Sequence, residues 1–100
     1  MVSPATLDEV LRVLRAKQPE ARALGIELVG VVGSLARGEA RPDSDADIIV
    51  RYQPSDLTFS RLFMFEEALA SELGRAVDIV FSEALSPGRR AYIERDLVAL

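Results

Sequence analysis

The sequence predicts a small α/β (α+β) fold in which a mixed small β-sheet is flanked by helices. Short β-branched apolar runs alternate along the chain with longer segments whose apolar residues follow the helical period. The chain has 100 residues, of which 49% are hydrophobic and 28% are charged, a composition typical of globular proteins. This length suits one core, so we expect a single domain over residues 1–100.

The first helix is expected over residues 5–17. Thr6 and Glu9 have the spacing of a capping box, and the apolar residues that follow keep the helical period. Pro19 is expected to interrupt this helix, because proline lacks the backbone N–H that continues the hydrogen-bond ladder. A short helical turn over residues 21–24 is expected to follow it.

Three segments are expected to form strands, at residues 26–32, 46–52 and 76–81. Each is short and rich in Val and Ile. The segment between the second and third strands predicts a helix, with a cap at Thr58, an end near Leu73 and one apolar face. Because such a helical crossover connects parallel strands, we expect the second and third strands to be parallel.

The last helix is expected to begin after Ser86, with Pro87 in the first helical position, and to run to about Arg95. Residues 97–100 are expected to add a short terminal strand. Apolar residues near this end either pack into the core or form a surface for a partner, and core packing is favoured. They are Tyr92, Ile93 and Leu97.

The composition excludes whole classes of chemistry, because the chain contains neither Cys nor His. Disulfides, thiolate nucleophiles, Cys/His zinc sites and proton transfer through imidazole are therefore excluded. The net charge of −4 gives no reason to expect strong nucleic-acid binding. No apolar run reaches the length of about 18 residues that spans a bilayer, so we expect a cytoplasmic protein that does not enter the membrane.

The predicted second strand begins with two closely spaced carboxylates, Asp45 and Asp47. Residues two apart on a strand project to the same side, so these carboxylates repel unless a cation lies between them. The plain alternative is that they belong to a solvated turn. However, Asp47 is followed at once by three apolar residues, and a strand bears such a carboxylate at a cost in stability.

Asp78 repeats this anomaly in the predicted third strand. If the two strands are parallel, Asp78 lies near Asp47, and three carboxylates converge on a site for a hard metal ion such as Mg²⁺ or Mn²⁺. The alternative is that Asp78 pairs with an arginine, for which Arg51 and Arg75 are the candidates. Three carboxylates without His or Cys favour the metal site.

A possible phosphate site lies directly before these carboxylates. Gly33 and Ser34 follow the first predicted strand, where a helix start would expose free backbone amides to an anion. Ser34 is alternatively an ordinary helix N-cap. Arg37 and Arg41 either contact phosphate or form surface pairs with nearby acidic residues. The letters do not fit a P-loop, an EF-hand or a nucleophile elbow.

The combined pattern resembles the DNA polymerase β-type nucleotidyltransferase superfamily. Gly33 and Ser34 are followed after ten residues by Asp45, then Asp47, with Asp78 on a later strand. The segments GSLARGEARPDSDADIIV and GRAVDIVFSEALSP closely resemble its small branch, the minimal nucleotidyltransferases. The resemblance covers about residues 5–95.

This resemblance implies the polymerase β-like nucleotidyltransferase fold and transfer of a nucleotidyl group, generally AMP from ATP, to a hydroxyl. It implies that Asp45, Asp47 and Asp78 hold two Mg²⁺ ions, with Mn²⁺ as a substitute, and that Gly33 and Ser34 bind the nucleotide, helped by Arg37 or Arg41. It also implies an antitoxin that adenylylates a tyrosine of a HEPN-domain toxin.

Two other functions are also consistent with the sequence. One is a nucleotide-binding antitoxin that masks its partner without catalysis. The other is transfer to a small molecule such as an aminoglycoside, which normally requires an added acceptor domain. The complete set of Asp45, Asp47, Asp78 and Ser34 favours retained catalysis.

Overall fold

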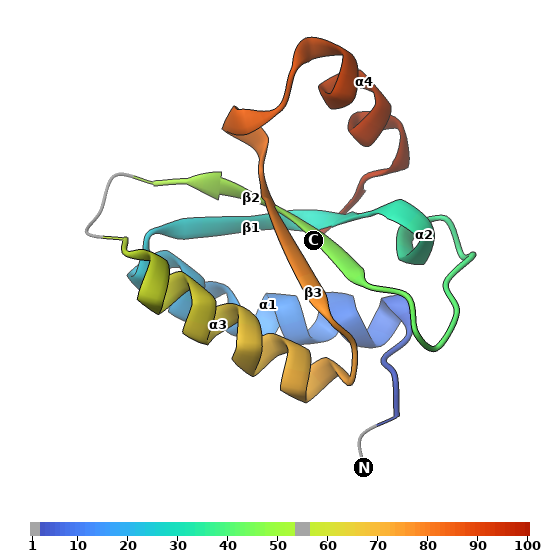
Figure 1. The fold of residues 1–100 in the computed structure, drawn as a ribbon, viewed down its shortest axis with the longest axis horizontal. Coiled ribbons are helices and arrows are strands. Elements are labelled where there is room, and N and C mark those ends of the chain that lie inside the picture. The colour runs from blue at the N-terminus through green and yellow to red at the C-terminus, as the bar shows by residue number, and fades with distance from the viewer. Residues whose placement is uncertain (1–2, 54–56) are drawn as a thin grey trace.

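The computed structural model describes residues 3–53 and 57–100. The chain forms a sheet with helices on both sides, which confirms the α+β class (Figure 1). The elements in chain order are α1 (Leu7–Leu24), β1 (Ile26–Val32), α2 (Gly33–Ala36), β2 (Ala46–Tyr52), α3 (Phe59–Leu73), β3 (Val77–Phe81), the 3₁₀ turn η1 (Ser82–Ala84), α4 (Pro87–Asp96) and β4 (Val98–Ala99).

The sheet is mixed, with the strand order β3-β2-β1-β4. Strands β2 and β3 are parallel, as the helical crossover predicted, and Asp47 is directly opposite Asp78 in their register. Strand β1 is antiparallel to β2, so Val32 at the end of β1 lies opposite Asp47 near the start of β2. This pairing brings the segment after β1 next to the carboxylates of β2 and β3.

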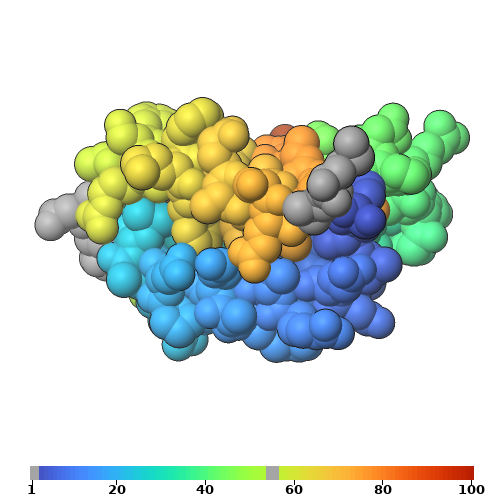
Figure 2. Space-filling model, turned by 90° about the horizontal axis from the view of Figure 1, so that it is seen from below, coloured from blue at the N-terminus to red at the C-terminus, as the bar shows by residue number. Residues whose placement is uncertain are grey.

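Helices α1 and α3 cover one face of the sheet. They lie side by side and occupy much of the view from below, whereas α4 lies on the opposite side of the sheet (Figures 1 and 2). Apolar side chains of α1, α3 and the central strands form the core, and several are fully buried; among them are Leu14, Ile48, Val50, Leu69 and Leu73. Burial of such side chains contributes roughly 1.5 to 3 kcal/mol each to folding.

Helix α1 continues through Pro19, so the interruption expected there is wrong. An internal proline removes one hydrogen bond and costs about 3 kcal/mol. Packing on both sides offsets this cost, because Ala21 and Leu24 are buried beyond the proline. Just before it, the Gln18 side chain donates to the Leu28 carbonyl and accepts from the Leu28 N–H, each at 2.8 Å.

The remaining predicted boundaries agree closely with the structure. Thr58 and Ser86 cap α3 and α4 through their side chains, and the terminal strand β4 is present. Tyr92 is exposed on α4, whereas Ile93 and Leu97 are half-buried. Among the helices of the described residues, none has the length and apolar character that crossing a membrane requires.

Candidate active site

The candidate site begins where β1 turns into the four-residue helix α2. Gly33 has φ of +80°, a conformation that residues with a side chain rarely adopt. A Cβ at Gly33 would also overlap the Asp47 carboxylate, so the glycine allows the backbone and the carboxylate to approach closely. The N-cap of α2 is Val32, and Ser34 lies inside the helix, so the plain alternative of Ser34 as N-cap is wrong.

Asp47 and Asp78 lie side by side on neighbouring strands. Burial raises the pKa of the half-buried Asp47 carboxyl, and the negative charges of Asp78 and Asp45 raise it further, while Arg37 lowers it. The three carboxylates thus lie within electrostatic reach of one another. Asp78 is exposed, and Asp45 is exposed immediately before β2.

The expected convergence of three carboxylates is partly realised. Within residues 3–53 and 57–100, no three His, Cys, Asp or Glu side chains are grouped closely enough to hold one metal ion. Mutual repulsion opposes closer approach of uncompensated carboxylates. The donors themselves are hard carboxylate oxygens, and burial, followed by the charges of Asp78 and Asp45, raises the pKa of Asp47. This donor set fits a hard divalent cation such as Mg²⁺.

A cavity of about 400 Å³ opens beside Asp47 and Asp78. Its size is within the usual range for small-molecule sites. One wall comes from the strand ends and α2, and the opposite wall comes from α4. The lining residues are Val32, Gly33, Arg37, Asp47, Asp78, Val80, Gly88, Arg89, Tyr92, Ile93 and Asp96. Of the residues predicted for the site, Gly33, Arg37, Asp47 and Asp78 line this cavity, whereas Ser34, Arg41 and Asp45 do not.

Arg37 links the two walls of the cavity. Its guanidinium contacts Glu39 at 3.1 Å and Asp96 of α4 at 2.9 Å. These hydrogen bonds, first that from Glu39 and then that from Asp96, raise the pKa of Arg37 above its usual value. The predicted surface pair with Glu39 is therefore present, but Arg37 also faces the cavity. Asp96 was not predicted, because nothing in the local sequence distinguishes it from any acidic residue at a helix end.

Arg41 is exposed in the loop between α2 and β2. The loop is held by Arg75, whose guanidinium donates to the carbonyls of Arg41 at 2.7 Å and Ser44 at 3.0 Å. Arg75 is thus used for the loop rather than for Asp78. The carbonyl contacts instead fix the segment that leads into Asp45.

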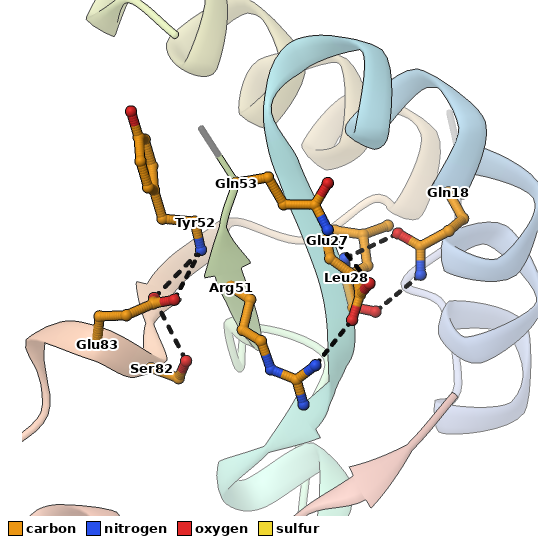
Figure 3. A network of polar contacts seen from close by, with 8 residues as sticks. All are labelled: Gln18, Glu27, Leu28, Arg51, Tyr52, Gln53, Ser82 and Glu83. Atoms are coloured by element: carbon orange, nitrogen blue, oxygen red, sulfur yellow. Dashed lines mark hydrogen bonds and ion pairs between the residues drawn. The ribbon is translucent and has the colours of Figure 1, made fainter. Parts of the chain in front are cut away.

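The other arginine considered for Asp78 is also engaged elsewhere. Arg51 contacts Glu27 of β1 at 3.0 Å, across the far part of the sheet (Figure 3). In the same region, the Glu83 carboxylate accepts from the Tyr52 N–H at 3.1 Å. The carboxylates of Glu27 and Glu83, at that end of the sheet, therefore have partners. The alternative that Asp78 pairs with Arg51 or Arg75 is wrong, because both arginines bind other groups.

A mixed sheet with aspartates on two parallel strands lies beside a glycine turn and a cavity of ligand size, as the resemblance to nucleotidyltransferases led us to expect. Comparison with known proteins gives the family directly. The model of the nucleotidyltransferase domain family matches residues 7–100, and the chain belongs to this family.

Similar proteins agree with this assignment. Protein adenylyltransferase MntA of Thermococcus cleftensis is 41% identical over 96 residues, which cover 93% of this chain and 94% of that protein. A provisionally assigned protein adenylyltransferase of Methanocaldococcus jannaschii is 30% identical, covering 93% of this chain and 96% of the relative. The protein is therefore a nucleotidyltransferase, as the resemblance implied.

Solved structures give the same fold. One, provisionally described as a minimal nucleotidyltransferase, matches with a TM-score of 0.77 and 34% identity, covering 95% of this chain and 96% of that one. A toxin–antitoxin crystal structure with AMP-PNP matches with a TM-score of 0.54 and 27% identity, covering 77% of this chain and 57% of that one.

Proposed function

We propose that this chain, acting as one domain over residues 1–100 in the cytoplasm, transfers AMP from ATP to a tyrosine hydroxyl of a HEPN-domain toxin and thereby acts as its antitoxin. The observation that carries the proposal is the pair Asp47 and Asp78, side by side at a cavity of about 400 Å³. A relative named protein adenylyltransferase and a toxin–antitoxin neighbour with AMP-PNP support the choice of nucleotide and partner.

The residues that would hold the metal are Asp45, Asp47 and Asp78. When bound, two Mg²⁺ ions, or Mn²⁺ in their place, would neutralise the triphosphate and lower the pKa of the attacking hydroxyl. Asp45 is exposed just outside the cavity, so it would join the other two carboxylates only when a cation offsets their repulsion. After burial, the negative charges of Asp78 and Asp45 contribute to the raised pKa of Asp47, and a cation would offset these two charges.

The other residues orient the substrate. Gly33 lines the cavity, where its backbone N–H would donate to the phosphates, and the Ser34 hydroxyl would donate to a phosphate oxygen. Arg37, on the cavity wall, would offset charge that develops on the phosphates. Arg41 is exposed and does not line the cavity, and it would contact the terminal phosphates from outside it.

The reaction exchanges one phosphorus–oxygen bond for another. The tyrosine oxygen forms a bond to the α-phosphorus of ATP, and the bond from that phosphorus to the departing pyrophosphate breaks. The exposed Asp78 carboxylate is available to accept the proton of the hydroxyl. The nucleophile belongs to the acceptor, so this chain needs neither His nor Cys.

Binding of Mg²⁺ and ATP tests the site. We expect them to raise the melting temperature of the wild type and of Asp43→Asn, since Asp43 is exposed and does not line the cavity. Asp47→Asn should lose the shift. Equal shifts for wild type and Asp47→Asn would refute the metal–nucleotide site.

The alternative of an antitoxin that masks its partner without catalysis predicts a different result in cells. If catalysis is required, Asp45→Asn/Asp47→Asn should bind the toxin yet fail to protect cells from it. Full protection by this double variant would favour masking.

A further inference from the structure

The cavity is lined by a residue of the same kind as the proposed acceptor. The chain contains two tyrosines, Tyr52 and Tyr92. Tyr92 lines the cavity together with Asp47 and Asp78, and 61% of it is exposed, so its hydroxyl is accessible. Tyr52, 48% exposed, lies at the other end of β2 and does not line this cavity.

Tyr92 belongs to α4, which forms one wall of the cavity. None of the residues of α4 is buried. Its side-chain contacts with the rest of the protein include the ion pair of Asp96 with Arg37 at 2.9 Å. A helix without buried side chains moves at low cost in free energy. Small movements of α4 would bring Tyr92 toward or away from the carboxylates across the cavity.

Two arginines lie close to Tyr92. Arg89 lines the same cavity, and the Arg95 guanidinium lies 5.8 Å from the centre of the Tyr92 ring. A phosphodiester on the Tyr92 oxygen would carry one negative charge in this region, where a guanidinium can pair with it. Asp47, Asp78 and Asp96 line the same cavity and would repel this negative charge, and the arginines would offset that repulsion.

We propose that Tyr92 is a site of self-adenylylation within the same molecule, an inference that rests on the proposed transfer of AMP to tyrosine. The Tyr92 oxygen forms a bond to the α-phosphorus of ATP, the bond to pyrophosphate breaks, and the phenolic proton passes to Asp78 or to water. Holding acceptor and donor on one chain gives this reaction a high effective concentration. The attached AMP then remains at the cavity and competes with the tyrosine of the partner.

The test uses the full chain with Mg²⁺ and ATP labelled at the α-phosphate, followed by intact mass measurement and peptide mapping. Wild type and Tyr52→Phe should gain the mass of one AMP group, at Tyr92. Tyr92→Phe, which retains the ring, and Asp47→Asn should gain none. The fraction modified per unit time should not depend on protein concentration, because the reaction is intramolecular.

A parallel reaction with the HEPN-domain protein separates the two proposals. If wild type labels that partner but Tyr92 remains unmodified, self-adenylylation is refuted and the proposed function stands. Label on Tyr52, equal label in Tyr92→Phe, or a rate that rises with protein concentration would also refute it. If no acceptor is labelled, the proposed function fails, and this inference fails with it.

Discussion

Substitution of Gly33 by alanine tests whether the close approach of Gly33 and Asp47 matters for activity as well as for stability. Gly33 has φ of +80°, where an L-residue with a Cβ costs about 1 to 2 kcal/mol relative to glycine. The new Cβ would also overlap Oδ2 of Asp47 and lie 3.3 Å from its Cγ. Gly33→Ala therefore has a conformational cost and a steric effect on the carboxylate.

Gly38 provides the matched control. It has φ of +76°, but a Cβ there would meet nothing within 4 Å. Gly38→Ala should thus have only the backbone cost of about 1 to 2 kcal/mol, a fall of roughly 4 to 16 °C in melting temperature for a domain of this size. The melting temperature of Gly33→Ala should fall at least as far, because this variant has the same backbone cost.

The activities of the two variants should differ much more than their stabilities. Relief of the overlap requires the Asp47 carboxylate to move by about 1 Å, and a displacement of this size at a reacting centre can cost about 100-fold in rate. We expect this loss in kcat/KM for AMP transfer by Gly33→Ala, measured well below its melting temperature, and little change for Gly38→Ala. Equal activities in the two variants would refute the proposal that the close approach of Gly33 and Asp47 is required for AMP transfer.

Two further substitutions test the charges around the cavity. Burial and the charge of Asp78 raise the pKa of Asp47 above its usual 3.8. Ionised Asp47 therefore destabilises the fold at any pH above this raised pKa. The destabilisation disappears as the pH falls to 3.8, because Asp47 is then protonated in the folded protein. Without divalent cations, Asp47→Asn should therefore melt at a higher temperature than wild type at neutral pH, and the difference should vanish in acid. A lower melting temperature of Asp47→Asn at neutral pH would contradict this expectation. Asp96→Asn weakens the contact that holds Arg37 at the cavity wall, so it should raise the KM for ATP several-fold. Glu39→Gln is the control, because the Glu39 side chain is 65% exposed, and it should change the KM little. Equal KM values for the two variants would show that Asp96 does not position Arg37.

Local patterns predicted the parts of the site that depend on neighbouring residues in the chain. Asp47 and Asp78 were each visible as a charge inside an apolar strand, and the helical crossover implied that their strands are parallel. Their register, in which the two residues lie opposite each other, is seen only in the structure, because parallel pairing alone does not set it. Gly33 was visible as the residue after a strand, although its collision with Asp47 depends on the antiparallel pairing of β1 with β2.

The second wall of the cavity could not be predicted in this way. Asp96 and Tyr92 belong to α4, which is far along the chain from the motif, and they reach the cavity only because the chain returns to the sheet through β4 beside β1. The continuity of α1 through Pro19 was missed for a similar reason. Local propensity disfavours it, and burial of residues beyond the proline decides the outcome.

The central claim is that Asp45, Asp47 and Asp78 catalyse transfer of AMP to a partner protein. The most direct measurement is transfer of label from ATP, labelled at the α-phosphate, to the proposed HEPN-domain partner in the presence of Mg²⁺. We expect the wild type to label one tyrosine peptide of the partner and Asp45→Asn/Asp47→Asn to label none. Equal labelling by the wild type and the double variant would contradict the account.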